Sequence, residues 1–104
     1  MYGTIRHMVA LPLFHSKFVY SDGAIREMVL WKLPKPTCDY AHGFKYRLHY
    51  GYPGGPTEVR YDNERGKGDH RHIGNREEPY QFIDVETLVR DFLSDIDFVR
   101  GGRV

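Results

Sequence analysis

Residues 44–62 read FKYRLHYGYPGGPTEVRYD, and this stretch decides the fold. In residues 44–52 every second residue is aromatic or aliphatic, and Lys, Arg and His stand between them. A period of two residues is that of a β-strand with one buried face. The Pro-Gly-Gly-Pro sequence at 53–56 is a turn signal, and charged residues again alternate with uncharged ones in 57–62. The stretch therefore predicts two neighbouring antiparallel strands.

The same alternation predicts a basic surface on the other face of this strand pair. Paired residues of antiparallel strands share a face, so burying both apolar sets exposes the residues between them. The basic residues among these are Lys45, Arg47, His49 and Arg60. We expect this surface to hold an anion such as a phosphate group.

Towards the N-terminus, residues 13–20 and 24–33 are β-prone and flank Ser-Asp-Gly, which predicts a hairpin. Two prolines then end the second strand, so residues 34–43 are expected to form a loop. The first dozen residues, 1–12, show no clear period and are expected to form an irregular arm or a short extra strand. A further short strand is predicted at 80–83.

The C-terminal part predicts one amphipathic helix. Apolar residues at 85, 88, 89, 92, 93, 96 and 99 form a single stripe at helical spacing. Asp84 is a good N-cap, and two glycines after Arg100 end the pattern. The sequence thus predicts an α+β fold, in which an antiparallel meander of about five strands packs against one C-terminal helix. Its length of 104 residues suits a single domain, 1–104.

Composition narrows the class of protein. The one cysteine, Cys38, excludes an internal disulfide framework and is expected to be inert. No apolar run reaches the ~18 residues of a membrane span, and no secretory leader is recognisable, so we expect a cytoplasmic protein. Residues 42–76 carry seven Lys and Arg against four Asp and Glu, together with four of the six histidines. This excess of positive charge again favours an anionic partner.

Residues 63–76, NERGKGDHRHIGNR, contain three glycines and one aliphatic residue, which predicts a long functional surface loop. Histidines there can exchange protons at neutral pH, and the cations can stabilise charge on phosphorus. This is the chemistry of RNA cleavage without a metal ion or other cofactor. The predicted catalytic residues are His70, His72, Arg60, Arg65 and Lys67, and the predicted phosphate-binding residues are Lys45, Arg47, His49 and Arg71.

The placement of the second proton-transfer group stays open. In an extended segment His70 and His72 point to the same side, about 7 Å apart. In-line transfer needs an acid and a base on opposite sides of the phosphorus. The partner of one histidine is therefore alternatively His49, Tyr61 or Lys67.

Two other functions remain open on the residues alone. The first is a non-catalytic module that binds RNA or a protein through the basic face. The second is a metal-dependent phosphodiesterase, with imidazole and carboxylate ligands. Its candidate ligands are Asp62, Asp69, His70 and His72.

Four segments together resemble a known family: DGAIREMVLWKLP (22–34), HGFKYRLHYG (42–51), VRYDNERGKGDHRHIGNREEPYQF (59–82) and VETLVRDFLSDI (85–96). They are similar to the TumE family of toxin–antitoxin proteins, over roughly residues 13–98. The resemblance implies a growth-inhibiting toxin of a type II toxin–antitoxin module that acts on RNA. It also implies an antitoxin partner that is a winged-helix DNA-binding protein. The matching site positions are Arg60, Asp62, Asn63, His70 and His72, which adds Asn63 to the expected phosphate-binding residues.

Aromatic residues suggest two further expectations. Trp31, Tyr46 and Tyr50 alternate with charged residues and are expected in the core, whereas Tyr40 and Tyr52 lie near turns and are candidates for stacking on bases. Strands at the edge of so small a sheet can pair with another chain, so we also expect a homodimer.

Overall fold

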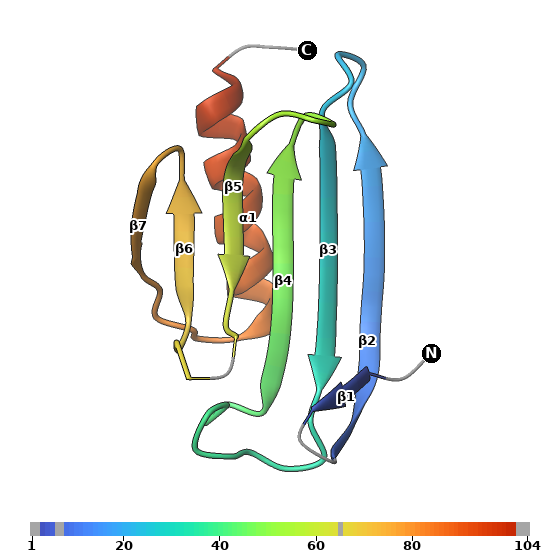
Figure 1. Ribbon diagram of the computed structural model, residues 1–104, viewed down its shortest axis with the longest axis vertical. Helices are drawn as coiled ribbons and strands as arrows, with labels where there is room; N and C mark the ends of the chain where they lie inside the picture. Colours follow the sequence, from blue (N-terminus) through green and yellow to red (C-terminus); the bar gives the residue numbers. More distant parts are fainter. Residues whose placement is uncertain (1–2, 6–7, 65, 102–104) are drawn as a thin grey trace.

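The computed structural model of the protein describes residues 3–5, 8–64 and 66–101 (Figure 1). These residues form one seven-stranded sheet and one helix. The strands lie in the sheet in chain order, and each pairs antiparallel with the next, as in a meander. The elements are β1 (Gly3–Ile5), β2 (Met8–Val19), β3 (Ile25–Lys32), β4 (Phe44–Gly51), β5 (Thr57–Asp62), β6 (His70–Ile73), β7 (Arg76–Pro79) and α1 (Val85–Arg100).

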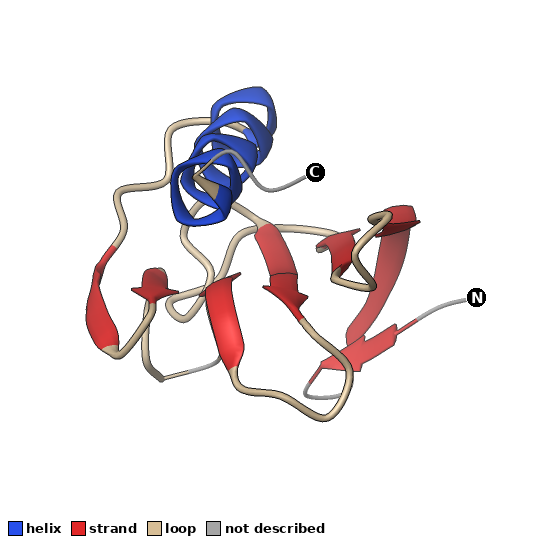
Figure 2. Ribbon diagram, turned by 90° about the horizontal axis from the view of Figure 1, so that it is seen from above, coloured by secondary structure: helices blue, strands red, loops and turns tan. Residues whose placement is uncertain are grey.

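Helix α1 covers one face of the sheet and leaves the other face open (Figure 2). It begins as the sequence predicts, because the Asp84 side chain accepts a hydrogen bond of 2.7 Å from the backbone N–H of Thr87. It ends at Gly101, whose φ of 50° is the left-handed conformation that glycine adopts most readily. The α+β class and the single C-terminal helix are therefore confirmed.

The core lies between α1 and the covered sheet face. Tyr46, Leu48 and Tyr50 of β4 are fully buried there, as the alternation in residues 44–52 predicts. The helix contributes its apolar stripe, with Leu88 and Phe92 at 0% exposure. Burial of alternate residues fixes the register of β4 and β5. The residues that alternate with the buried ones along each strand therefore point to the open face.

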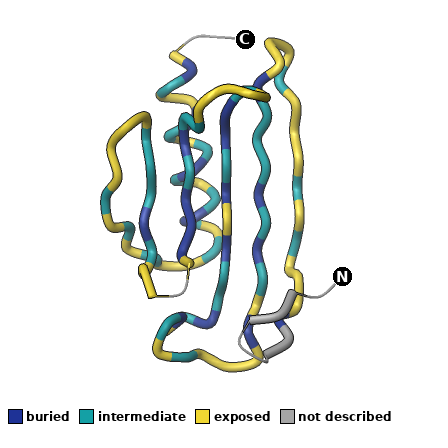
Figure 3. The backbone as a smooth tube through the Cα atoms, viewed as in Figure 1, coloured by how far each residue is buried: buried dark blue, intermediate teal, exposed yellow. Residues whose placement is uncertain are grey.

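The N-terminal segment forms the extra short strand that was one of its two expected states. β1 pairs with residues 8–10 of β2 and leaves residues 11–19 without a strand neighbour on the outer side, within the described part of the chain. Figure 3 shows that much of β2 is exposed. Four large apolar side chains of this outer strand are 46–58% exposed: Leu11, Leu13, Phe18 and Val19.

The expectation of one loop over residues 63–76 was wrong in its second half. Residues 70–73 form β6, a turn follows at Gly74 with φ of 62°, and β7 begins at Arg76. The expected strand at 80–83 was also wrong, because these residues lie between β7 and α1 in no strand. Both faces of β6 carry charged or polar residues, so its period of two does not separate apolar from polar positions.

Candidate functional site

Strand register aligns titratable side chains in two rows across the open sheet face. One residue from each of β3 to β7 forms the first row: Glu27, His49, Arg60, His72 and Glu77. The second row runs beside it through β4, β5 and β6: Arg47, Asp62 and His70. Because consecutive members are direct cross-strand partners, their side chains are neighbours on one face. The predicted basic surface therefore lies where the sequence places it.

Arg60 occupies the middle of the first row. It is the cross-strand partner of His49 on β4 and of His72 on β6. Its Nε lies 3.1 Å from Asp62 Oδ2 in an ion pair, while about a third of the side chain (34%) stays exposed. The guanidinium is thus oriented by a carboxylate and still accessible to an anion.

His72 is the more accessible of the two predicted catalytic histidines. Its Nε2 lies 2.9 Å from Glu77 Oε2 and 3.4 Å from Arg60 Nη2, and 29% of its side chain is exposed. The hydrogen bond with His72 lowers the pKa of Glu77, so that carboxylate stays charged at neutral pH. Glu77 can therefore orient the imidazole and stabilise its protonated form.

His70 is held more firmly than His72. Its Nδ1 donates to the carbonyl oxygen of Gly68 at 3.1 Å, and its Nε2 lies 2.8 Å from Asp62 Oδ1. Only 11% of the side chain is exposed. The two histidine rings lie on the same face with centroids 6.2 Å apart, so they approach one phosphate from one side. This arrangement suits His70 for positioning Asp62, and through it Arg60.

His49 faces Arg60 from the opposite side. Its Nε2 lies 2.9 Å from Thr57 Oγ1. Burial lowers the pKa of His49, and the nearby cations of Arg60 and Arg47 lower it further against the opposing charge of Glu27. The ring is therefore neutral at pH 7 and able to accept a proton.

A hollow of about 250 Å³ lies over the second row, and we call it the phosphate hollow. Two arginines and one lysine bring positive charge to it, against the carboxylates of Asp62 and Glu64. It is lined by Arg47, Arg60, Asp62, Glu64, Lys67 and His70. Such a concentration of guanidinium and ammonium groups suits an anion of the size of a phosphate.

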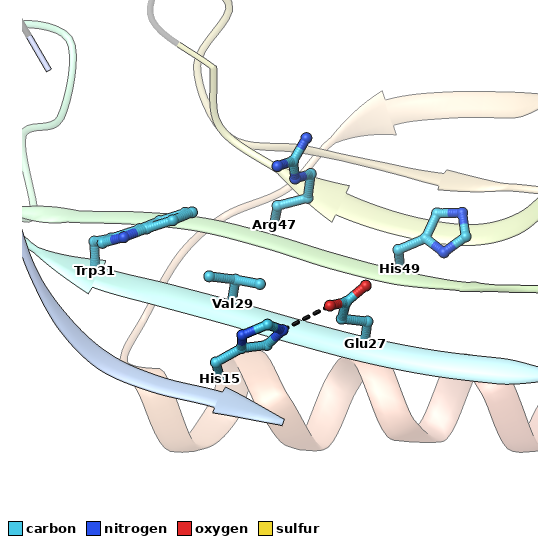
Figure 4. Close-up of a pocket in the computed structure, with 6 residues that line it drawn as sticks. All are labelled: His15, Glu27, Val29, Trp31, Arg47 and His49. Carbon is cyan, nitrogen blue, oxygen red and sulfur yellow. Dashed lines mark hydrogen bonds and ion pairs between the residues drawn. The ribbon is translucent and has the colours of Figure 1, made fainter. Parts of the chain in front are cut away.

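A second hollow of about 420 Å³ continues the same face across β2, β3 and β4 (Figure 4). We call it the tryptophan hollow, because the Trp31 indole lies along one of its walls. The remaining lining residues are His15, Glu27, Val29, Arg47 and His49. Arg47 belongs to both hollows, so the two adjoin.

The sequence of the chain also matches a family of toxins. The match, to the family described as Toxin TumE, spans residues 10–100 and includes every member of both rows. The chain belongs to the TumE family. The resemblance found in the sequence is thereby confirmed, and with it a role as a toxin that has an antitoxin partner. Comparison with curated proteins gave no significant match, nor did comparison with solved structures. Within the described ranges, no helix of this TumE toxin is long and apolar enough to cross a membrane.

Three of the predicted site residues of this TumE toxin lie away from the open face. Arg71 faces the helix, where its guanidinium donates to Glu78 Oε2 at 2.7 Å and to Asp95 Oδ2 at 3.1 Å. Tyr61 also bonds to Asp95, and burial together with that bond raises its pKa well above the ordinary value. Asn63 is fully buried, accepting from the Tyr46 N–H at 3.0 Å and donating to the Phe44 carbonyl at 2.9 Å.

The remaining predicted residues are distributed as follows. Lys45 lies on the open face beside Trp31, with its Nζ 5.8 Å from the ring centroid, and burial lowers its pKa. Lys67 reaches the phosphate hollow. Arg65 lies outside the described residues.

The alternative metal site is not assembled among the described residues. The Asp69 carboxylate accepts hydrogen bonds from the Tyr46 hydroxyl at 2.7 Å and lies 2.8 Å from His42 Nε2, away from the two rows. No group of three or more His, Cys, Asp or Glu side chains in the described ranges is arranged to hold a metal ion.

The aromatic residues follow the expectations only in part. Tyr46 and Tyr50 are buried as predicted, but Trp31 is only partly buried and lines the open face. Tyr40 is 3% exposed and cannot stack on a base, and the Tyr52 hydroxyl donates to Asp22 at 2.7 Å. A signal for Trp31 was present, because it is in phase with Glu27 and out of phase with the apolar residues 28 and 30.

Proposed function

We propose that this TumE toxin cleaves RNA without a metal ion, at a phosphate bound by Arg60 between His49 and His72. The observation that carries the proposal is the first row itself, in which Arg60 has one histidine on each neighbouring strand. Two strand spacings separate those histidines, which is roughly 10 Å. A phosphate placed over Arg60 would therefore have an imidazole on either side, as in-line proton transfer requires.

The proposed reaction assigns a separate task to each histidine. Neutral His49 takes the proton of the ribose 2′-hydroxyl as that oxygen forms a bond to phosphorus. Protonated His72, oriented by Glu77, donates a proton to the 5′-oxygen as its bond to phosphorus breaks. The products are a 2′,3′-cyclic phosphate and a 5′-hydroxyl.

Cations supply the second part of the proposed catalysis. Arg60 stabilises the negative charge that develops on the phosphate oxygens, and Arg47 and Lys67 hold the neighbouring backbone in the phosphate hollow. His70 acts as a positioning residue, because it holds Asp62, which in turn orients Arg60. Lys45 extends the phosphate-binding surface along β4.

The proposal also covers the class of antitoxin that binds this toxin. We expect the antitoxin of this type II module to be a winged-helix DNA-binding protein, and to inhibit by covering the two rows. An acidic surface would suit the excess of cations around the phosphate hollow. Because the proposed target is RNA, we expect the toxin to act in the cytoplasm.

The test is incubation of purified protein with single-stranded and structured RNA, with and without EDTA, at pH 6–8. Cleavage that persists in EDTA, yields 2′,3′-cyclic ends and is lost in His72→Ala and Arg60→Ala supports the proposal. Lys35→Ala, which removes an exposed cation from the loop before β4, is the matched control and should cleave normally. Loss of cleavage in EDTA would instead favour the metal-dependent reaction, and salt-sensitive RNA binding without cleavage would favour a non-catalytic module.

A further inference from the structure

We infer that the tryptophan hollow is a nucleobase subsite that selects guanine beside the cleaved phosphate. This inference rests on the proposed RNA cleavage, and it names a substrate preference for the same face. It starts from the adjacency of the two hollows. Arg47 lines both, and Glu27, His49 and Arg60 are consecutive members of one row. Glu27 and Arg60 lie two strand spacings apart, roughly 10 Å, which is about the reach from a base to its phosphate.

The apolar part of the hollow suits the flat face of a base. Figure 4 shows Val29 between the Trp31 ring and the polar side chains of the rim. The indole is anchored from behind, because Trp31 packs against the buried cluster of Ala10, Leu33 and Tyr40. A ring that is fixed in this way loses little freedom when a base stacks on it. Stacking on an aromatic side chain raises affinity by roughly 5- to 150-fold per base.

The polar part of the hollow suits the edge of a guanine. Glu27 offers two carboxylate oxygens, and His15 Nε2 lies 2.6 Å from one of them, Oε2. Guanine alone among the four bases presents two adjacent N–H donors, N1–H and N2–H, next to an acceptor, O6. The carboxylate of Glu27 can accept from both N–H groups, and the imidazole of His15 can donate to O6. Adenine, cytosine and uracil each leave at least one of these three protein groups without a partner.

Both rim residues are accessible for this purpose. The side chain of His15 is 60% exposed and that of Glu27 is 41% exposed. Their pairing in the free protein holds the carboxylate and the imidazole together at the edge of the hollow (Figure 4). On binding of guanine, the His15 N–H would pass from Glu27 to O6, and the two carboxylate oxygens would accept from the base in its place.

Trp31 provides a direct readout, since it is the one tryptophan of the sequence. Titration with 3′-GMP should quench its fluorescence at concentrations at least tenfold lower than titration with 3′-UMP, with 3′-AMP and 3′-CMP between them. Ribose 5-phosphate should leave the fluorescence unchanged, and N-acetyltryptophanamide corrects for absorption by the nucleotides. Equal quenching by all four nucleotides, or none by any, would overturn the inference.

Variants separate stacking from edge recognition. Glu27→Gln should bind 3′-GMP and 3′-UMP within about threefold of each other, because the amide offers a single acceptor oxygen. Glu58→Gln alters another acidic residue of the sheet and is the matched control, which should retain the preference. Trp31→Ala should lose nucleotide binding in calorimetry, whereas Trp31→Phe should retain most of it. Circular dichroism confirms that each variant is folded, and retention of the preference in folded Glu27→Gln would contradict the assignment.

The nucleotide titration and the cleavage assay can fail independently. Binding of 3′-GMP with no cleavage of any RNA would overturn the proposed function and leave the base subsite standing. Cleavage after all four bases at equal rates, with no quenching by 3′-GMP, would overturn the subsite and leave the proposed function standing.

Discussion

Arg71 and His72 are adjacent in β6 and serve opposite faces of the sheet. Arg71 donates to Asp95 of α1, at 3.1 Å, and so joins the sheet to the helix. The His72 imidazole lies 2.9 Å from Glu77 on the open face. Because successive side chains of a strand alternate between faces, one residue of β6 stabilises the fold while the next is available for chemistry.

The first prediction follows from this division. Arg71→Ala should lower the free energy of unfolding by about 1–2 kcal/mol, because it takes from half-buried Asp95 the guanidinium that donates to it. His72→Ala should change stability little and abolish cleavage. Urea denaturation and the RNA assay, applied to both variants, measure the two effects. A folded Arg71→Ala protein that is as inactive as His72→Ala would contradict the assignment.

Asn63 leads to a prediction about stability rather than RNA binding. Its amide satisfies the backbone N–H of Tyr46 and the carbonyl of Phe44, and the residue is fully buried. Asn63→Ala should therefore cost about 1–3 kcal/mol, since two buried backbone groups lose their partners. Asn63→Asp should not recover this loss, because a buried carboxylate loses its hydration and cannot donate to the Phe44 carbonyl. Thermal denaturation gives the ranking, and a wild-type melting temperature for Asn63→Ala would count against it.

The pKa of His49 predicts the acid side of the pH–rate profile. Burial and the charge of Arg60 lower this pKa below the ordinary 6.5, so the neutral base persists to lower pH than in a free histidine. The rate should therefore rise with pH through that lowered pKa of His49. NMR titration of the His49 ring should give the midpoint of the acid limb. The role of His49 would be contradicted if the midpoint of the acid limb lay above pH 6.5. It would also be contradicted if the residual activity of the His49→Gln variant showed the same midpoint as the wild type.

Arg47 predicts the salt dependence of RNA binding. A side chain that pairs with a phosphate displaces counterions, so the slope of log affinity against log salt falls when it is removed. Arg47→Ala should weaken binding to uncleavable 2′-deoxy-substituted RNA and reduce the slope by roughly 1. Arg71→Ala is the control, because it removes a cation from the helix-covered face. An equal change of slope in both variants would show that Arg47 acts only through overall charge.

Elements with one apolar side could be predicted from the sequence, whereas an element with polar residues on both sides could not. The alternation around Tyr46 and the stripe around Phe92 each have one clear apolar side, so strand, helix and basic surface follow from them. β6 carries polar residues on both sides, because Arg71 pairs with the helix and His70 with Asp62. Its sequence therefore shows no alternation of apolar and polar residues from which a strand could be predicted. The burial of Asn63 depends on its hydrogen bond with the backbone of Tyr46, which is 17 residues away in the sequence. No local sequence pattern encodes such a contact.

The free edge of β2 carries the last prediction, which concerns assembly. β1 pairs with β2 over residues 8–10, and residues 11–19 have no strand neighbour on their outer side in the described ranges. Leu13 and Val19 are 47% and 58% exposed along this edge.

An edge of this length with exposed apolar side chains readily accepts another strand. We expect two copies to pair along this edge, because pairing would cover Leu13 and Val19 and would satisfy backbone groups of both chains. Light scattering at increasing concentration should then approach twice the 12.2 kDa chain mass. Leu13→Lys should shift the equilibrium to the monomer, because a charged side chain on an exposed strand edge opposes pairing with another strand, and Lys35→Ala should not. Hydrogen exchange should slow in residues 11–19 as the dimer forms.

A monomer at all concentrations would exclude the dimer. A dimer whose exchange protection lies only on α1 would place the interface on the helix instead.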